Sequence, residues 1–330
     1  MKQYSILNLD TTTEEEKRKV FYRWSPLKPG EKVRMQIAGL GDVGGTVLLG
    51  LLLTAENVIK DIGIYDKNQL LCTRWELETA QVASPFERRE VPAVHTLDED
   101  ELFQCDIFVF CIAKCIPPIG GKEKDVRMAQ FEENRKIVSA YARMAADRGY
   151  QGLFLVVSDP VDLLCKAALL ASQEGLCPLE PEQIQGCGLG VMNARALYYA
   201  KKDVRCQMFE KEGRVFGPHG KELVVANSII PEHYDHALSL YLTEQTVNAN
   251  MQVRKTGFKP YIAPAISSAA YTIPKIISGQ WNYSSNYLSG VYFGAKNRRT
   301  DHGIEWENTE LHPMLFARIK EAYESLRVVL

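Results

Sequence analysis

The strongest constraint on the fold is a glycine-rich turn that separates two apolar segments. The run Val33–Ala38 is followed by Gly39, Gly41 and Gly44 in the spacing GxGxxG, and a second apolar segment continues to Ala55. This order predicts a buried strand, a tight turn and a helix, as at the start of a dinucleotide-binding βαβ unit. In such a unit the first glycine permits the turn, and the second lets the backbone approach a pyrophosphate. The third allows the helix to pack closely on the strand.

An acidic residue follows the next apolar run. That run, at residues 62–65, ends at Asp66, about 20 residues beyond the last glycine of the motif. A carboxylate there accepts hydrogen bonds from the adenosine ribose hydroxyls and repels a 2′-phosphate, so we expect NAD rather than NADP. The adjacent Lys67 is the one feature that weakens this preference for NAD. The predicted cofactor-binding residues are Gly39, Gly41, Asp42, Val43, Gly44 and Asp66.

Length and composition narrow the class of protein. A chain of 330 residues is longer than a usual single core, so two domains are expected. The net charge of −2, with 24% charged residues, lacks the basic excess of a nucleic-acid-binding protein. No apolar run approaches the ~20 residues that cross a bilayer. We therefore expect neither nucleic acid nor membrane as a partner, and a cytoplasmic location.

The cysteines and histidines do not predict a metal site. Most of the eight cysteines lie in apolar surroundings, which favours buried thiols in a reducing compartment over disulfides. Cys105, Cys111 and Cys115 are close in sequence but form no CxxC pair. His233 and His236 have ligand-like spacing, yet no further ligand lies near them, so a turn or a helix start is expected.

The pattern along the chain predicts an α/β protein with a doubly wound parallel sheet. Residues 1–32 form an arm, in which Thr11 marks a helix start. Between residues 33 and 160, near-continuous apolar strands alternate with helices, as in a parallel sheet covered on both faces. Strands are expected at residues 33–38, 62–65, 106–113 and 153–157, and helices at residues 43–55 and 126–148.

The pattern changes after residue 160, where a second unit at residues 161–330 is expected. A helix is predicted at residues 161–172, and strands at 214–216 and 223–230 enclose a polar turn. Residues 265–277 predict one helix despite Pro274. The last helix begins at Met314, because apolar residues recur there with the spacing of one buried stripe.

Further motifs follow the glycine turn. They are Arg127 with Asn134, Ser-Asp-Pro-Val-Asp at 158–162, Met-Asn-Ala-Arg at 192–195, and Phe-Gly-Pro-His-Gly-Lys at 216–221. In this order, behind GxGxxG, they resemble the NAD-dependent L-lactate and malate dehydrogenase family from Val33 to the C-terminus. The resemblance implies a Rossmann NAD-binding domain at 33–160, a mixed α/β catalytic domain at 161–330, and reversible hydride transfer between NAD(H) and a 2-hydroxy or 2-oxo acid. It also implies a homo-oligomer, a dimer or tetramer, whose neighbouring subunit the arm before Val33 would embrace.

The resemblance implies roles for three side chains. His219 is similar to the family's catalytic histidine, which takes the hydroxyl proton as hydride leaves. Arg195 is similar to the arginine that binds the substrate carboxylate through two parallel hydrogen bonds. Arg127 is similar to the arginine of a mobile loop, which polarises the reacting carbonyl after the loop closes.

The chain departs from the family around the substrate. Met192 stands where the family has the aspartate that orients the histidine, and Asp159 stands where it has an asparagine that donates to the substrate oxygen. A thioether cannot orient an imidazole, and an ionised carboxylate only accepts hydrogen bonds. Gly121, with Lys122 beside it, replaces the arginine of malate enzymes and the glutamine of lactate enzymes. The predicted catalytic residues are His219, Arg127 and Asp159, and the predicted substrate-binding residues are Arg195, Gly121, Lys122 and Met192.

Two roles are open to Asp159. It either pairs with the imidazolium of His219 in place of the missing aspartate, or binds an ammonium group on an unusual substrate. The main hypothesis is an NAD-dependent 2-hydroxyacid dehydrogenase with an altered pocket for a small carboxylate-bearing substrate. The alternatives are a non-catalytic NAD-binding sensor or structural protein, and a malate dehydrogenase that uses Lys122 as its selector.

Overall fold

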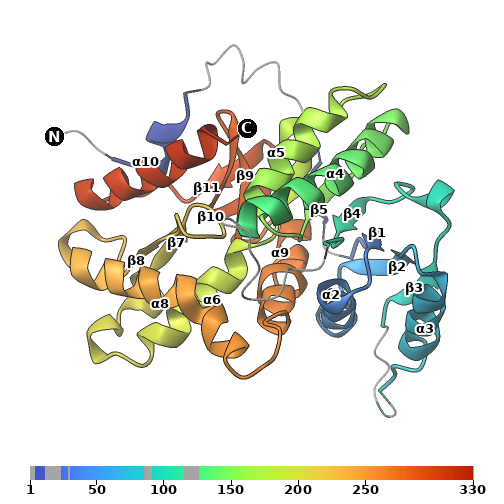
Figure 1. The fold of residues 1–330 in the computed structure, drawn as a ribbon, viewed down its shortest axis with the longest axis horizontal. Coiled ribbons are helices and arrows are strands. Elements are labelled where there is room, and N and C mark those ends of the chain that lie inside the picture. The colour runs from blue at the N-terminus through green and yellow to red at the C-terminus, as the bar shows by residue number, and fades with distance from the viewer. Residues whose placement is uncertain are drawn as a thin grey trace.

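Nine strands form one continuous sheet in the computed structural model, which describes residues 4–11, 24–28, 30–84, 86, 91–114 and 126–329 (Figure 1). The first six strands are β1 (Val33–Ala38), β2 (Ile59–Tyr65), β3 (Ala93–Thr96), β4 (Ile107–Phe110), β5 (Leu153–Val156) and β6 (Ile184–Gly186). They lie in the order β3-β2-β1-β4-β5-β6 and pair in parallel. This is the strand order of the dinucleotide-binding fold, so the predicted doubly wound parallel sheet is confirmed.

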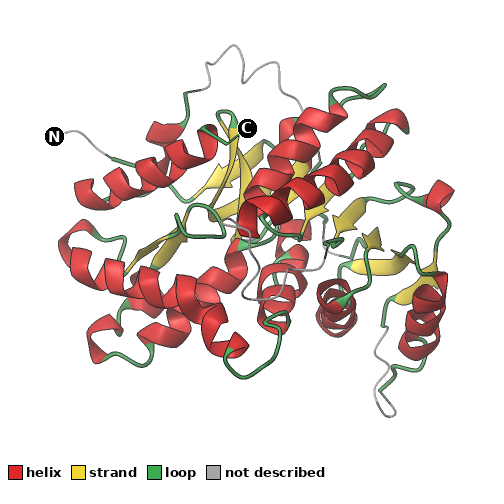
Figure 2. Ribbon diagram, in the orientation of Figure 1, coloured by secondary structure: helices red, strands yellow, loops and turns green. Residues whose placement is uncertain are grey.

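Helices cover both faces of the parallel strands (Figure 2). They are α2 (Asp42–Thr54), α3 (Gln69–Thr79), α4 (Val126–Asp147) and α5 (Val161–Ser172). Phe108 of β4 belongs to the apolar core beneath α4 and α5, whereas its neighbour Val109 belongs to the core beneath α2 and α3. Successive side chains of a strand point to opposite faces, so a strand covered on both sides has no polar face and reads as a continuous apolar run.

The sheet continues beyond β6 with antiparallel strands. These are β9 (Asn282–Leu288), β10 (Val291–Thr300) and β11 (Gly303–Trp306), and β6 pairs with β9 at Gly186 and Ser285. A separate ribbon of β7 (Arg214–Phe216) and β8 (Val224–Ala226) lies in the same half, with α6 (Leu189–Ala200), α7 (Phe209–Glu212), α8 (His236–Arg254) and α10 (Pro313–Arg327). The sheet thus runs across residue 160, and the domain division there stays a prediction.

The prediction of one helix at residues 265–277 is wrong. The chain forms a π-helical segment, η6 (Pro264–Ala270), then a turn, and then the short helix α9 (Ile273–Ile277). Pro274 lies in the first turn of α9. A proline there removes no intrahelical hydrogen bond, because the first amides of a helix have no carbonyl partner within it. The proline therefore helps to start a helix instead of interrupting one.

The described cysteines are free thiols. Cys72, Cys111, Cys165, Cys187 and Cys206 are buried, as predicted, whereas the other two described thiols, at residues 105 and 177, are half-buried and exposed. Burial raises the pKa of the Cys187 thiol to about 12, which keeps it protonated and unreactive. Residue 115 lies outside the described residues. In the described part of the chain, no helix is long and apolar enough to cross a bilayer.

His233 and His236 bind different partners. The Nδ1 of His233 lies 3.0 Å from the Glu212 carboxylate, and the Nδ1 of His236 lies 3.1 Å from the Tyr234 hydroxyl. His236 is the first residue of α8, and Asp235 caps that helix by accepting a backbone hydrogen bond. The predicted helix start is confirmed. Within the described residues, no three His, Cys, Asp or Glu side chains gather as metal ligands.

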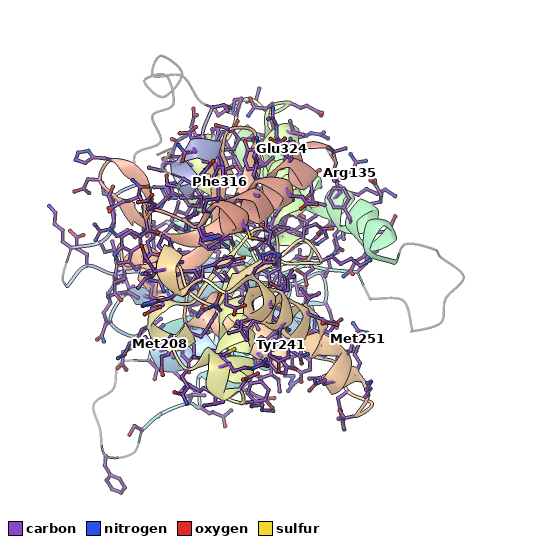
Figure 3. The ribbon with its side chains drawn as sticks, turned by 90° about the vertical axis from the view of Figure 1, so that its left-hand side faces the viewer. Arg135, Met208, Tyr241, Met251, Phe316 and Glu324 are labelled. Carbon is purple, nitrogen blue, oxygen red and sulfur yellow. The ribbon has the colours of Figure 1, made fainter. Side chains whose placement is uncertain are left out.

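The beginning of the arm packs on its own chain. The short helix η1 (Ile6–Leu9) buries its first and last side chains in the main apolar core. Phe316 lies on α10 (Figure 3). Its ring contacts the ring of Tyr4, with 5.1 Å between the ring centroids. The helix expected after Thr11 falls on residues 12–23, outside the described ones. Contact between the arm and a neighbouring subunit stays a prediction.

Candidate active site

The glycine turn joins β1 to α2. Gly39 has φ +92°, a conformation that residues with a side chain rarely adopt, and its amide donates to the Tyr65 carbonyl at 2.8 Å. A Cβ at Gly44 would lie 1.8 Å from the Gly39 carbonyl oxygen, so that helix position requires glycine. Gly41 is the N-cap of α2, and a Cβ there would meet no described atom within 4 Å. The side of the turn at Gly41 is therefore open, which fits a pyrophosphate beside the first amides of α2.

Asp66 lies at the end of β2 and holds the turn. Its Oδ2 accepts a hydrogen bond from the Leu40 amide at 2.9 Å, and its Oδ1 accepts one from the Asn68 amide at 3.0 Å. The contact with Leu40 gives Asp66 a structural role that its place after an apolar run did not reveal. Each carboxylate oxygen can accept a second hydrogen bond, so the binding of ribose by Asp66 stays a prediction.

Asp42 and Val43 begin α2 directly after the turn. Val43 is half-buried and packs against the core beneath α2. The Asp42 carboxylate lies at the surface, with its Oδ2 3.0 Å from the Nζ of Lys259. Lys259 comes from the loop between α8 and η6, so this ion pair joins the two halves of the chain beside the glycine turn.

His219 and Asp159 lie in direct contact. His219 belongs to the turn between β7 and β8, and Asp159 follows β5 immediately before a cis peptide bond to Pro160. The Nδ1 of His219 is 2.8 Å from the Oδ1 of Asp159. The side chain of His219 is 10% exposed and that of Asp159 is 53% exposed. The structure therefore brings together the two groups whose pairing the substitution at Met192 suggested.

A second aspartate, which the sequence analysis did not assign, positions the same histidine. Asp162 lies in the first turn of α5, and its Oδ2 accepts a hydrogen bond from the His219 amide at 2.9 Å. Its Oδ1 accepts one from the Ser285 hydroxyl at 2.5 Å. Burial raises the pKa of the Asp162 carboxyl, and these two hydrogen bonds act in the opposite direction. The one sequence feature that could have pointed to Asp162 is its place in the motif at 158–162.

Arg195 projects from α6 and is held by two side chains. Its Nη1 lies 3.4 Å from the Sδ of Met192, and its Nη2 donates to the Oδ1 of Asn250 on α8. Met192 is only 2% exposed and belongs to the core beneath α6. Burial lowers the pKa of Arg195 below its usual value, and the nearby Asp159 carboxylate offsets part of that decrease. No local sequence signal pointed to Asn250, because it is 55 positions from Arg195.

Asn134 joins the end of β4 to Asp159. Its side chain is fully buried, and its Nδ2 donates to the Asp159 carbonyl at 2.8 Å. Its Oδ1 accepts a hydrogen bond from the Lys114 amide at 2.9 Å. Lys114 is the last described residue before the predicted mobile loop. Asn134 therefore connects the backbone at Lys114 to the backbone at Asp159.

Three predicted residues cannot be placed in the site. Gly121 and Lys122 lie outside the described residues. Arg127 is in the first turn of α4, and its side chain is not described. Their roles in substrate selection and in polarising the carbonyl stay predictions.

Known proteins that resemble the chain are lactate and malate dehydrogenases. The L-lactate dehydrogenase of Treponema denticola is 28% identical over 194 residues, which cover 58% of this chain and 56% of that protein. The malate dehydrogenase of Sulfurisphaera tokodaii is 25% identical over 197 residues, which cover 60% of this chain and 59% of that protein. The chain thus matches less than two thirds of the length of these relatives. No protein-family model matches it.

Solved structures share the fold over nearly the whole chain. The minor L-lactate dehydrogenase from Enterococcus mundtii has a TM-score of 0.70 and 17% identity, covering 90% of this chain and 97% of that one. The malate dehydrogenase from Salinibacter ruber has a TM-score of 0.68 and 17% identity, covering 89% of this chain and 95% of that one. The chain therefore has the fold of the lactate and malate dehydrogenases and resembles that family in sequence.

Proposed function

We propose that this protein is an NAD-dependent oxidoreductase that transfers hydride between NAD(H) and a small 2-hydroxy or 2-oxo acid. The resemblance to lactate and malate dehydrogenases supports the class of reaction. The contact between His219 and Asp159 carries the proposal. It gives the histidine a carboxylate partner although Met192 occupies the position of the family's aspartate. A histidine that transfers protons depends strongly on such a partner.

The residues around the glycine turn fit NAD. The open side of Gly41 and the first amides of α2 would hold the pyrophosphate, and Asp66 would face the adenosine ribose. When bound, NAD accepts hydride from a hydroxy acid and NADH donates hydride to an oxo acid. The carboxylate of Asp66 would repel a 2′-phosphate, which favours NAD over NADP.

Asp159 determines which nitrogen of His219 meets the substrate. Because Nδ1 is bonded to the carboxylate, Nε2 is the nitrogen left to exchange a proton. In the oxidation of a hydroxy acid, Nε2 takes the hydroxyl proton and the carboxylate stabilises the resulting imidazolium. In the reduction of an oxo acid, Nε2 returns that proton to the forming hydroxyl. Asp162 acts as a positioning residue, because it holds the backbone of His219.

Arg195 would bind the carboxylate of the substrate. Its planar guanidinium matches a carboxylate with two parallel hydrogen bonds, and its contacts with Asn250 and Met192 fix the orientation of that plane. Asp159 is engaged by His219, which favours its orienting role over the binding of a substrate ammonium.

An NAD-binding protein without turnover is the second candidate function. The observation that favours it is the exposure of Asp159, whose side chain is 53% accessible. A carboxylate that is half in water stabilises a neighbouring cation less than a buried one. Asp159 also lacks the amide donor that would polarise a substrate oxygen.

A kinetic screen distinguishes these functions. Purified protein is mixed with NADH and a panel of 2-oxo acids, or with NAD and 2-hydroxy acids, including amino-substituted members, and NADH absorbance is followed. We expect turnover with at least one pair. We also expect that His219→Gln abolishes turnover but leaves NADH affinity unchanged, with the exposed His302→Gln as the control. Binding of NADH without any turnover would favour the second function, and failure to bind NADH would overturn the cofactor proposal.

A further inference from the structure

We propose that Lys259 is a cofactor-binding residue, which neutralises Asp42 and so allows the pyrophosphate of the dinucleotide to lie at the start of α2. The inference rests on the proposed NAD site. Asp42 is the first residue of α2, and its Oδ2 is 3.0 Å from the Nζ of Lys259. The two residues are 217 positions apart, so the fold alone brings them together.

Asp42 places a negative charge where a bound anion is expected. The first amides of α2 and the helix dipole attract a pyrophosphate, and the Asp42 carboxylate lies in the same field. Two anions a few ångströms apart repel each other, and the repulsion grows when a bound ligand excludes water. The ammonium group of Lys259 offsets the charge of Asp42. Its three N–H donors also allow it to contact a phosphate oxygen while it keeps the carboxylate.

The packing of η6 on α2 positions the loop that carries Lys259. Near the end of α2, the Thr54 hydroxyl donates to the Ala270 carbonyl at 3.2 Å. A Cβ at Gly50 would lie 2.5 Å from the Cβ of Ala270, so glycine lets the two helical segments approach closely. The end of η6 therefore contacts the second half of α2. The loop that precedes η6, which carries Lys259, reaches the first half.

The same region of the chain also contacts the substrate arginine. Asn250, near the end of α8, accepts a hydrogen bond from Arg195. A change in this region could therefore alter the KM for substrate as well as the affinity for cofactor. The test below measures cofactor affinity without substrate, because that separates the two effects.

The test compares two lysines of one segment by NADH fluorescence titration. Lys259→Met removes the proposed contact, and Lys255→Met removes an equal charge from the exposed end of α8. We expect Lys259→Met to raise the NADH dissociation constant about tenfold, and Lys255→Met to change it by less than about twofold. High salt should reduce the difference between wild type and Lys259→Met. The side chain of Lys259 is 76% exposed, and Lys255 is exposed as well. Both variants should therefore melt at the wild-type temperature.

A double variant tests the charge relation directly. If Lys259 offsets Asp42, then Asp42→Asn in the Lys259→Met background restores much of the lost affinity, because the unpaired carboxylate is gone. Equal NADH affinities of Lys259→Met and Lys255→Met overturn the inference, and so does a double variant that binds no better than Lys259→Met. If the wild-type protein itself fails to bind NADH, the proposed function fails and the inference fails with it. If wild type binds NADH and Lys259→Met binds equally well, the inference alone fails.

Discussion

His219 is held by two aspartates that come from one short segment after β5. Asp159 contacts the ring and Asp162 accepts a hydrogen bond from the backbone amide, so this segment holds both the imidazole and the turn that carries it. The environments of the two carboxyls differ. Asp159 is half-exposed, whereas burial raises the pKa of Asp162. In the proposed mechanism their roles differ accordingly, because Asp159 would stabilise the protonated ring and Asp162 would hold the backbone that carries it.

Asp159→Asn tests the first of these roles. Although asparagine is the family residue, it cannot stabilise an imidazolium as a carboxylate does, so we expect turnover to fall at least a hundredfold. The corresponding change behind the histidine of serine proteases costs about 10⁴-fold. NADH affinity should not change. The exposed Asp301→Asn serves as the control, and a rate equal to wild type in Asp159→Asn would remove Asp159 from the mechanism.

Replacing either of two glycines of the turn by alanine should have different effects, one on NADH affinity and the other on stability. Gly41→Ala adds a methyl group to open space, so the free energy of unfolding should stay within about 0.5 kcal/mol of wild type while NADH affinity falls at least about tenfold. In Gly44→Ala the methyl group collides with the Gly39 carbonyl, so the protein should lose about 1–3 kcal/mol of stability. Urea unfolding and NADH titration of both proteins measure this. Normal NADH binding by Gly41→Ala would contradict the placement of the pyrophosphate.

Residues in local motifs could be predicted from the sequence, and their long-range partners could not. The turn at Gly39 and the proximity of Asp159 to His219 follow from spacing and from the family resemblance. Asn250 and Lys259 depend on how α8 and the loop after it pack against α6 and α2. No short-range pattern encodes that packing.

At the level of elements, apolar patterning predicted the most apolar strands of the sheet, β1, β2, β4 and β5, and the two strands of the ribbon, β7 and β8. It missed the short parallel strands β3 and β6 and the antiparallel strands β9, β10 and β11. β1 was predicted with its observed bounds because four of its six side chains, at positions 33, 35, 37 and 38, belong to the apolar cores on the two faces of the sheet. β9 is buried too, but it carries Ser284 and Asn286, whose exposed fractions are 0%. Hydrogen bonds compensate for burying such groups, as when Gln185 donates to Ser284 at 2.9 Å. A strand whose interior is polar gives no hydrophobic signal.

An ion-pair cluster joins the β7–β8 ribbon to the large sheet. Arg214 of β7 donates to Glu307, which follows β11, at 2.8 Å, and Lys296 of β10 also contacts this carboxylate. Burial alone would raise the pKa of Glu307, but the hydrogen bonds from Arg214 and Lys296 outweigh it and hold the pKa below its usual range. The Glu307 side chain is 18% exposed, so solvent screens the cluster only partly.

The pH dependence of stability should reveal this cluster. Because the folded pKa of Glu307 is lower than the unfolded one, its carboxylate stabilises the fold above about pH 4.3, and the contribution is lost as the pH falls through the folded pKa. We expect Glu307→Gln to lose about 2 kcal/mol at pH 7 and progressively less towards pH 3. The exposed pair of Glu305 and Arg298 provides the control, because Glu305→Gln should cost at most about 0.5 kcal/mol. Urea unfolding of wild type and variant across this pH range is the measurement. If Glu307→Gln loses the same free energy of unfolding at every pH, the ion pairs of Glu307 do not stabilise the fold as described.

For the molecule as a whole, the arm contributes to the stability of its own chain. Ile6 is 2% exposed within the main core, whereas Leu7, its neighbour in η1, is 40% exposed. We expect Ile6→Ala to lower the free energy of unfolding by about 2 kcal/mol and Leu7→Ala to change it by less than about 0.5 kcal/mol. Urea denaturation of the two variants decides this. Equal losses would mean that η1 does not pack on the core in solution.

The junction between β6 and β9 also has a mechanical consequence. Gly186 and Ser285 pair where the parallel half of the sheet meets the antiparallel half. The Ser285 hydroxyl donates to Asp162, and the backbone amide of His219 donates to the same carboxylate, so two hydrogen bonds connect this joint to the backbone of His219. A displacement of one half of the sheet relative to the other would therefore move the turn that carries His219.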